Sequence, residues 1–154
     1  MKTKILLGLV VLFLALQAIR PEKNLSTTTP FTGKDDITLL FPTPPEVRQI
    51  LAASCYDCHS NSTHYPWYAE VQPVGWWLAS HVNEARRELN FAEFGQYPRK
   101  RQIKKLEAMA DEVRDGGMPL KSYTFIHRNA QLSAAQIDAL CHWAEATGDK
   151  VPAP

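Results

Sequence analysis

The hydrophobic pattern begins with a long apolar segment at the start of the chain. Two lysines precede an apolar run from Ile5 to Ile19 that one glutamine interrupts, and Arg20 and a proline close it. The run lies between the length of a signal-peptide core and the roughly 20 residues that span a bilayer. The best cleavage point follows Ala18, but Leu16 stands where a small residue is usual. We therefore expect residues 1–20 to be an uncleaved signal anchor, with a cleaved signal peptide as the alternative.

Residues 21–42 carry no sustained hydrophobic periodicity. They contain three consecutive threonines, Pro30, Gly33 and an acidic pair before the chain reaches Phe41. Such residues between periodic segments are typical of loops. We therefore expect residues 21–42 to be a linker and residues 43–150 to form the folded domain.

The folded part opens with a predicted helix. Thr43 is placed as its N-cap, Pro44 as its first residue and Glu46 as the partner in a capping box. The apolar stripe of this helix consists of Val47, Ile50 and Leu51. The helix is expected to run directly into a cysteine motif.

Three further helices are predicted by apolar residues that recur at steps of three and four. The first covers about 74–89, and the second covers about 98–113 and ends at a Gly-Gly pair. The last begins at Ser133, whose partner Gln136 completes a second capping box. Their apolar positions are Val74, Trp77, His81, Val82, Ala85 and Leu89, then Ile103, Leu106, Ala110 and Val113, then Ile137, Leu140, Cys141 and Ala144. No alternating strand pattern is visible, so we expect an all-α fold.

Composition and charge narrow the class of protein. The chain has 154 residues, a formal net charge of +1 and 45% hydrophobic residues, which suits one globular domain with an appendage. The near balance of charge argues against nucleic acid as a partner. A local basic cluster most often forms the solvated face of a helix. This cluster consists of Arg99, Lys100, Arg101, Lys104 and Lys105.

The candidate chemistry lies in the sequence Cys55-Tyr-Asp-Cys58-His59, which matches the C-x-x-C-H pattern for attachment of a c-type haem. Two thiols one helical turn apart can each add to a haem vinyl group, and the next residue then directs an imidazole at the iron. We expect one covalent haem c with His59 as an axial iron ligand. An acceptor is needed to orient the imidazole; backbone carbonyls near Pro66 and Pro73 are candidates, and the sequence does not choose between them.

Other interpretations of the two cysteines are weaker. A thioredoxin-like site is expected beside a βαβ pattern, which the sequence lacks. A zinc site needs more ligands, and the third cysteine, Cys141, lies in a predicted helix, where it reads as a small buried apolar residue. A disulfide between Cys55 and Cys58 closes too short a loop to stabilise the fold much.

Met118 is the leading candidate for the sixth iron ligand. It follows two glycines and precedes a proline, so it lies in a loop, and helical packing does not explain it. Its thioether stabilises ferrous iron relative to histidine. Met109 is already explained as packing, and His81, which shares a predicted helix face with Trp77, is the best rival ligand. Trp77 is expected to pack around the cofactor.

Several stretches in order carry a resemblance to a known family. These stretches are CYDCHSNSTHYPWY, VQPVGWWLASHVNEARRELNF, GGMPLKSYTFIH and LSAAQIDALCHWA. The chain resembles the haem-binding domain proteins found among bacterial exported proteins, and the order of its elements resembles a class I cytochrome c. The resemblance covers about residues 40–146 and implies a c-type haem held by Cys55, Cys58 and His59, in a cytochrome c-like helical domain.

The functional expectation is therefore electron transfer rather than enzymatic catalysis. We expect a membrane-tethered cytochrome on the periplasmic side of the bacterial inner membrane, with redox proteins as partners; cleavage of the signal would instead leave it soluble in the periplasm. The first alternative is a haem sensor or a peroxidase-like enzyme with an open or His81-lined distal side. A further alternative is a non-haem binding module with a short structural disulfide.

Overall fold

The computed structural model describes residues 1–26 and 31–152, and in these ranges it is helical apart from one isolated bridge between Leu25 and Ser62. The α-helices are α1 (Lys2–Leu16), α2 (Ile37–Leu40), α3 (Pro45–Ser54), α4 (Tyr56–His59), α5 (Val74–Glu88), α6 (Arg99–Arg114), α7 (Lys121–Ile126) and α8 (Ala134–Gly148). The 3₁₀ helices are η1 (Trp67–Glu70), η2 (Phe91–Gln96) and η3 (Arg128–Ala130). The all-α expectation is confirmed.

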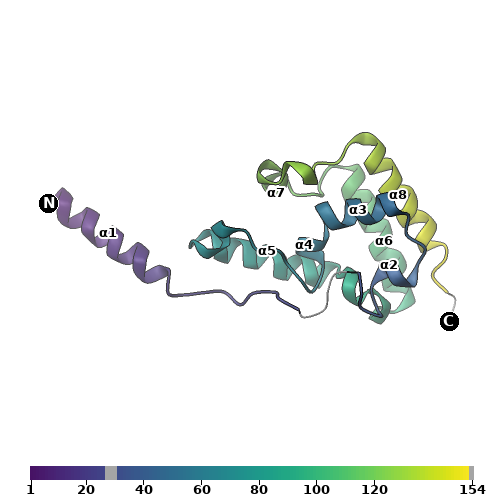
Figure 1. Ribbon diagram of the computed structural model, residues 1–154, viewed down its shortest axis with the longest axis horizontal. Coiled ribbons are helices and arrows are strands. Elements are labelled where there is room, and N and C mark those ends of the chain that lie inside the picture. The colour runs from purple at the N-terminus through teal and green to yellow at the C-terminus, as the bar shows by residue number, and fades with distance from the viewer. Residues whose placement is uncertain (27–30, 153–154) are drawn as a thin grey trace.

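The core forms where α3, α6 and α8 meet. Helices α6 and α8 make the most extensive contact between elements, and α3 packs on α8 (Figure 1). Leu51, Leu106 and Leu140 are almost completely buried there. The basic cluster of α6 lies at the surface, as its sequence predicts. The apolar stripes expected for α3 and α8 are largely buried, so the period-3.6 pattern identifies these inner faces.

The helix ends agree with the sequence in two cases and differ in one. Ser133 and Gln136 form the predicted capping box of α8. Helix α6 ends in a Schellman motif in which Gly116 adopts a φ of 73°. The predicted capping box at Thr43 is wrong, because α3 begins one residue later than expected and the Thr43 hydroxyl donates instead to the Phe41 carbonyl at 3.0 Å.

The inner face of α5 also differs from the prediction. Gly75, Ala79 and Val82 are its buried residues, whereas Trp77 is 48% exposed and His81 is half-exposed. The physical reason is close packing on η1: a Cβ at position 75 would clash with the Ala69 carbonyl oxygen. Small residues therefore face the neighbouring element, and the aromatic residues lie on the flank.

The predicted linker is only partly a linker. Residues 27–30 lie outside the described ranges, but Asp36 and Ile37 are buried, and α2 packs against η2. The Asp36 carboxylate accepts hydrogen bonds from the Tyr56 hydroxyl at 3.0 Å and from the backbone amide of Thr38 at 2.9 Å. The folded domain thus begins before residue 43, at the segment that contains α2.

Helix α1 extends from the domain at the end where α5 begins (Figure 1). The Trp76 indole donates to the Ile19 carbonyl at 2.9 Å, and the Gln17 side chain accepts from the Gln72 amide at 2.8 Å. Arg20 pairs with Glu70 close by. Within the described ranges, no helix combines the length and the apolar character needed to cross a bilayer. The N-terminal anchor stays a prediction.

Candidate functional site

The cysteine motif occupies a single turn that follows α3. Cys55 caps the end of α3, its amide donating to the Leu51 carbonyl at 3.0 Å. The His59 amide then donates to the Cys55 carbonyl at 2.9 Å, which closes the turn of α4. Helix α4 contacts α3, α5 and η2, so the motif is held from several sides.

The imidazole of His59 is oriented by a backbone carbonyl. Its Nδ1 lies 2.9 Å from the Leu89 carbonyl oxygen, so Nδ1 carries the proton and donates it to this bond. That tautomer leaves the lone pair of Nε2 available to a metal. Burial lowers the pKa of His59, although the bond to Leu89 opposes this effect, and the neutral ligand form is favoured.

The acceptor is not the one that the sequence suggests. A carbonyl near Pro66 or Pro73 was the expectation, and the structure places Leu89 there instead. Leu89 directly follows α5, where helix carbonyls run out of partners within the helix. The chain therefore offers a free carbonyl at this point, but its proximity to His59 depends on how α5 packs on α4.

A cavity of about 270 Å³ opens beside the motif and is called the first cavity here. Cys55, His59 and Met118 all line it, so the structure brings the predicted axial ligand and the loop methionine to one space. The wall is otherwise mostly apolar and includes Leu89, Phe91, Met109, Val113 and Leu132. Met109 belongs to the buried core, as expected for a packing residue.

A second cavity, of about 340 Å³, opens on the side of Cys58. Its lining is largely aromatic and aliphatic and includes Trp67, Tyr68, Trp77, Leu78, His81, Leu120, Tyr123 and Ile126. The loop from Met118 to Leu120 contributes to both cavities. A group bonded to both cysteine sulfurs would therefore reach both spaces.

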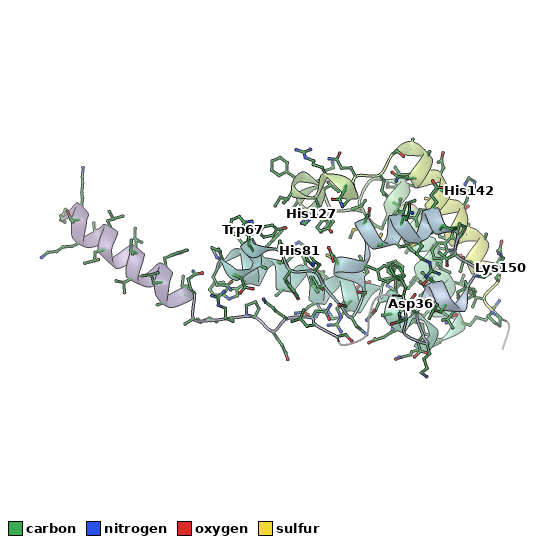
Figure 2. The ribbon with its side chains drawn as sticks, in the orientation of Figure 1. Asp36, Trp67, His81, His127, His142 and Lys150 are labelled. Carbon is green, nitrogen blue, oxygen red and sulfur yellow. The ribbon has the colours of Figure 1, made fainter. Side chains whose placement is uncertain are left out.

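His81 and Trp77 lie at the second cavity rather than beside His59. The Nδ1 of His81 bonds the Trp77 carbonyl at 2.9 Å, and the two rings are 4.3 Å apart. Figure 2 shows His81 and Trp67 on the side of α5 that faces His127. His59 and Met118 therefore line one cavity, and His81 lines the other.

Both motif cysteines are free thiols. Burial raises the pKa of Cys55 to about 12 and that of Cys58 to about 11, so both remain protonated at neutral pH. Cys141 is buried in the core and its thiol donates to the Ala110 carbonyl, in agreement with a packing role. No group of three metal-ligating side chains occurs among the described residues, which gives no support to a zinc site.

Sequence reasoning missed the role of Asp57, which lies between the two cysteines of the motif. Its Oδ2 accepts a hydrogen bond from the Tyr123 hydroxyl at 2.8 Å, and its Oδ1 accepts from the His64 amide at 3.1 Å. Tyr123 also stacks on His127. The motif pattern leaves this position unspecified, so only the fold shows its partners.

Comparison with known families adds the deciding observation. The model of the haem-binding domain family matches residues 11–146, which is most of the chain. The chain belongs to the haem-binding domain family. No curated protein and no solved structure matches it. Membership supports haem binding by this helical domain, and the cavities beside the motif are where the domain has room for the group.

The residues present in this haem-binding domain fit a c-type haem. Two free thiols one turn apart suit attachment, a neutral imidazole with a free Nε2 suits iron, and the surrounding walls are apolar. Apolar walls exclude water, which raises the reduction potential of a buried iron centre. The donor set and its surroundings therefore agree with the family assignment.

Proposed function

We propose that the protein is an exported c-type cytochrome that carries one covalently bound haem and transfers electrons. The observation that carries the proposal is the shared first cavity: His59, whose Nδ1 is bonded to the Leu89 carbonyl, and Met118 line the same space. A haem supplies a one-electron carrier when bound there. The protein's part is to hold it, exclude water and set its potential.

Covalent attachment is supported by the two free thiols. Each Cys S–H adds across one vinyl group, so that a C–S bond and a C–H bond form and no external oxidant is consumed. Cys55 faces the first cavity and Cys58 faces the second, so the two bonds fix the group across both. We propose that the domain is a cytochrome c-like one in this sense.

Electron transfer is favoured over enzymatic chemistry by the placement of Met118. His59 and Met118 would together hold the iron, which would leave it no position for a substrate. His81, the distal acid or base of a peroxidase-like alternative, lines the other cavity. We therefore propose redox proteins as partners and no catalytic residues.

The proposed location is the periplasmic side of the bacterial inner membrane. Apolar helix α1 lies outside the domain and has no buried residue, which is the character of a segment that is held in lipid. Covalent haem attachment typically takes place outside the cytoplasm, which agrees with an exported domain. The N-terminal segment would hold the domain near its partners.

The proposal is tested by expressing the full chain with a haem c maturation system. We expect haem to remain on the chain after denaturation, whereas a variant with Cys55→Ser and Cys58→Ser loses it on denaturation. Cys141→Ser is the matched control and retains covalent haem, because Cys141 lies in the core away from the cavities. Release of haem from the denatured wild type would refute covalent attachment.

The axial ligand is tested by spectroscopy of ferric Met118→Ala. We expect the variant to lose the weak red charge-transfer band that is typical of methionine-ligated ferric haem. Met109 lines the same cavity, so Met109→Leu serves as a control. We expect this variant to keep the band. An unchanged low-spin spectrum in Met118→Ala would assign the sixth ligand to a histidine, of which His81 is the first candidate. A high-spin spectrum in the wild type would favour the sensor or peroxidase-like alternative.

A further inference from the structure

The segment that carries Met118 is weakly packed for a segment that holds an iron ligand. Helix α7, which follows Met118 closely, has no buried residue. Phe125 is 71% exposed and Ile126 is 57% exposed. A segment with so few buried apolar contacts opens locally at low free-energy cost. Met118 itself packs against the edge of the core, and hydrogen bonds hold the rest of the segment.

On the N-terminal side, the loop is fixed to the end of α6. The amides of Gly117 and Met118 both donate to the Glu112 carbonyl, at 2.9 and 3.1 Å. The positive φ of Gly116 lets the chain reverse so that these bonds can form. This attachment sets where the loop begins, but α6 does not belong to the cysteine motif.

On the C-terminal side, the loop is fixed to the motif itself. The Tyr123 hydroxyl donates to Asp57 Oδ2 at 2.8 Å, and Asp57 lies in α4 between Cys55 and His59. A hydrogen bond to a carboxylate is stronger than one between neutral groups. The second carboxylate oxygen accepts from the His64 amide, which fixes the orientation of the Asp57 side chain.

The Tyr123 ring is held in place by a second set of contacts. It stacks on His127 with 4.3 Å between ring centroids and 18° between ring planes. His127 Nε2 in turn lies 2.8 Å from the Tyr68 hydroxyl of η1. The phenol of Tyr123 is thus directed at Asp57 from a fixed ring.

We propose that the hydrogen bond from Tyr123 to Asp57 positions Met118 in the first cavity, so that the segment bearing the distal ligand is tied to the turn bearing His59. Tyr123 and Asp57 are positioning residues, because they act through the loop. This inference rests on the proposed Met118 ligation. The bond links the two ligand-bearing segments directly, and four residues separate Met118 from Tyr123.

The test uses Tyr123→Phe in the full chain loaded with haem. The substitution keeps the ring and its stacking but removes the hydroxyl. We expect exogenous imidazole to displace the iron ligand about tenfold faster than in the wild type, because loss of a charge-assisted bond frees the loop. We also expect a lower reduction potential and faster amide hydrogen exchange over residues 118–126.

Tyr65→Phe is the matched control. The Tyr65 hydroxyl also makes a 2.8 Å hydrogen bond, accepting from the Asn24 amide, and Tyr65 lines neither of the two cavities. We expect this variant to lose some thermal stability while keeping the wild-type displacement rate and potential. Asp57→Asn retains one carbonyl oxygen as an acceptor, and we expect it to accelerate displacement less than Asp57→Ala does.

The outcomes separate the two proposals. If Met118→Ala abolishes the charge-transfer band while Tyr123→Phe leaves the displacement rate and the exchange over residues 118–126 unchanged, the positioning role is refuted and Met118 ligation stands. If Met118→Ala leaves the band unchanged, Met118 ligation is refuted, and the positioning role falls with it. Equal acceleration in Tyr65→Phe would show a general loss of stability and would also overturn the proposal.

Discussion

Tyr56 fixes the cysteine motif to the rest of the core. Its side chain is 3% exposed, stacks on Phe91 at 5.3 Å between centroids and donates to Asp36, which is 1% exposed. A buried carboxylate is costly unless it is hydrogen-bonded, so Asp36 depends on Tyr56 and Thr38 for its stability in the core. Tyr56, at a position that the C-x-x-C-H pattern leaves unspecified, therefore stabilises the core.

We predict that Tyr56→Phe lowers the free energy of unfolding of the haem-loaded protein by about 1–3 kcal/mol at neutral pH. In the variant, the buried Asp36 carboxylate loses the hydrogen bond from the Tyr56 hydroxyl. Urea unfolding followed by circular dichroism measures the difference. Phe keeps the stacked ring, so an unchanged midpoint would show that the hydroxyl contributes nothing.

The same pair gives a pH dependence. Burial, and then the neighbouring charge of Asp36, raise the pKa of Tyr56 above its ordinary value. Above about pH 10 the unfolded chain releases the phenol proton while the folded chain keeps it, so this contribution to stability falls as the pH rises. The destabilisation by Tyr56→Phe should therefore shrink above about pH 10. A difference that stays constant from about pH 8 to about pH 11 would contradict this linkage.

At the scale of single elements, Ser133 and Thr43 both resemble N-caps in the sequence, but we expect their substitution to affect stability differently. Ser133 forms a complete capping box with Gln136, whereas Thr43 does not cap α3. We expect Ser133→Ala to cost about 1 kcal/mol of stability and Thr43→Ala to stay within about 0.5 kcal/mol of the wild type. Thermal or urea unfolding of the two variants side by side tests the contrast. Equal losses would mean that the capping contacts do not decide the stability of these helices.

The elements that the sequence predicts well are those with local signals. Helices α5, α6 and α8 follow from periodicity and end signals such as Ser133 and the glycine pair after α6, which need only neighbouring residues. The predicted inner face of α5 is correct at Val82 and Leu89, which are buried, but wrong at Val74 and Trp77, which are exposed. Gly75 faces η1 instead, since close approach of two backbones requires a small side chain, and Ala79 is also buried.

The segment before residue 43 was missed for a different reason. Helix α2 has four residues, which is too short for any periodicity to appear. Its burial depends on Asp36, a residue whose charge reads as solvent-exposed in the sequence alone. Only the partner Tyr56, distant along the chain, makes that burial possible.

At the scale of the whole molecule, some features of the candidate site follow from local sequence signals and others depend on tertiary packing. Cys55, Cys58 and His59 follow from one fixed spacing, and Met118 follows from its loop context. The position of the Leu89 carbonyl depends on how α5 packs on α4, and the two cavities are lined by segments distant along the chain, so no local pattern carries that information.

We predict that covalent haem stabilises the whole domain. The apolar walls of two cavities are covered only when the group fills them, and a ligand bound to the native state shifts the unfolding equilibrium. The same chain produced without haem maturation should melt about 10 °C or more below the haem-loaded protein. Differential scanning calorimetry of both forms measures this. Equal melting temperatures would show that the domain is fully stable with its cavities empty.

The last prediction concerns the N-terminal segment. Helix α1 exposes apolar side chains around its whole circumference, with Leu6 at 62%, Leu9 at 58% and Phe13 at 47%. So large an apolar surface is unfavourable in water and is typical of a segment in contact with lipid. We therefore expect the full chain to fractionate with membranes and to resist salt extraction, because the tether is apolar rather than electrostatic.

The control for this prediction substitutes exposed apolar side chains that lie outside α1. Leu6, Leu9 and Phe13 are changed together to Gln, and Leu25, Leu39 and Leu40, which are also exposed, are changed to Gln in a separate variant. We expect only the first set to release the protein into the soluble fraction, because α1 then loses its affinity for lipid.

Intact mass spectrometry decides between the two fates of the signal: a chain that lacks residues 1–18 in the soluble periplasmic fraction would show cleavage after Ala18 and overturn the tether.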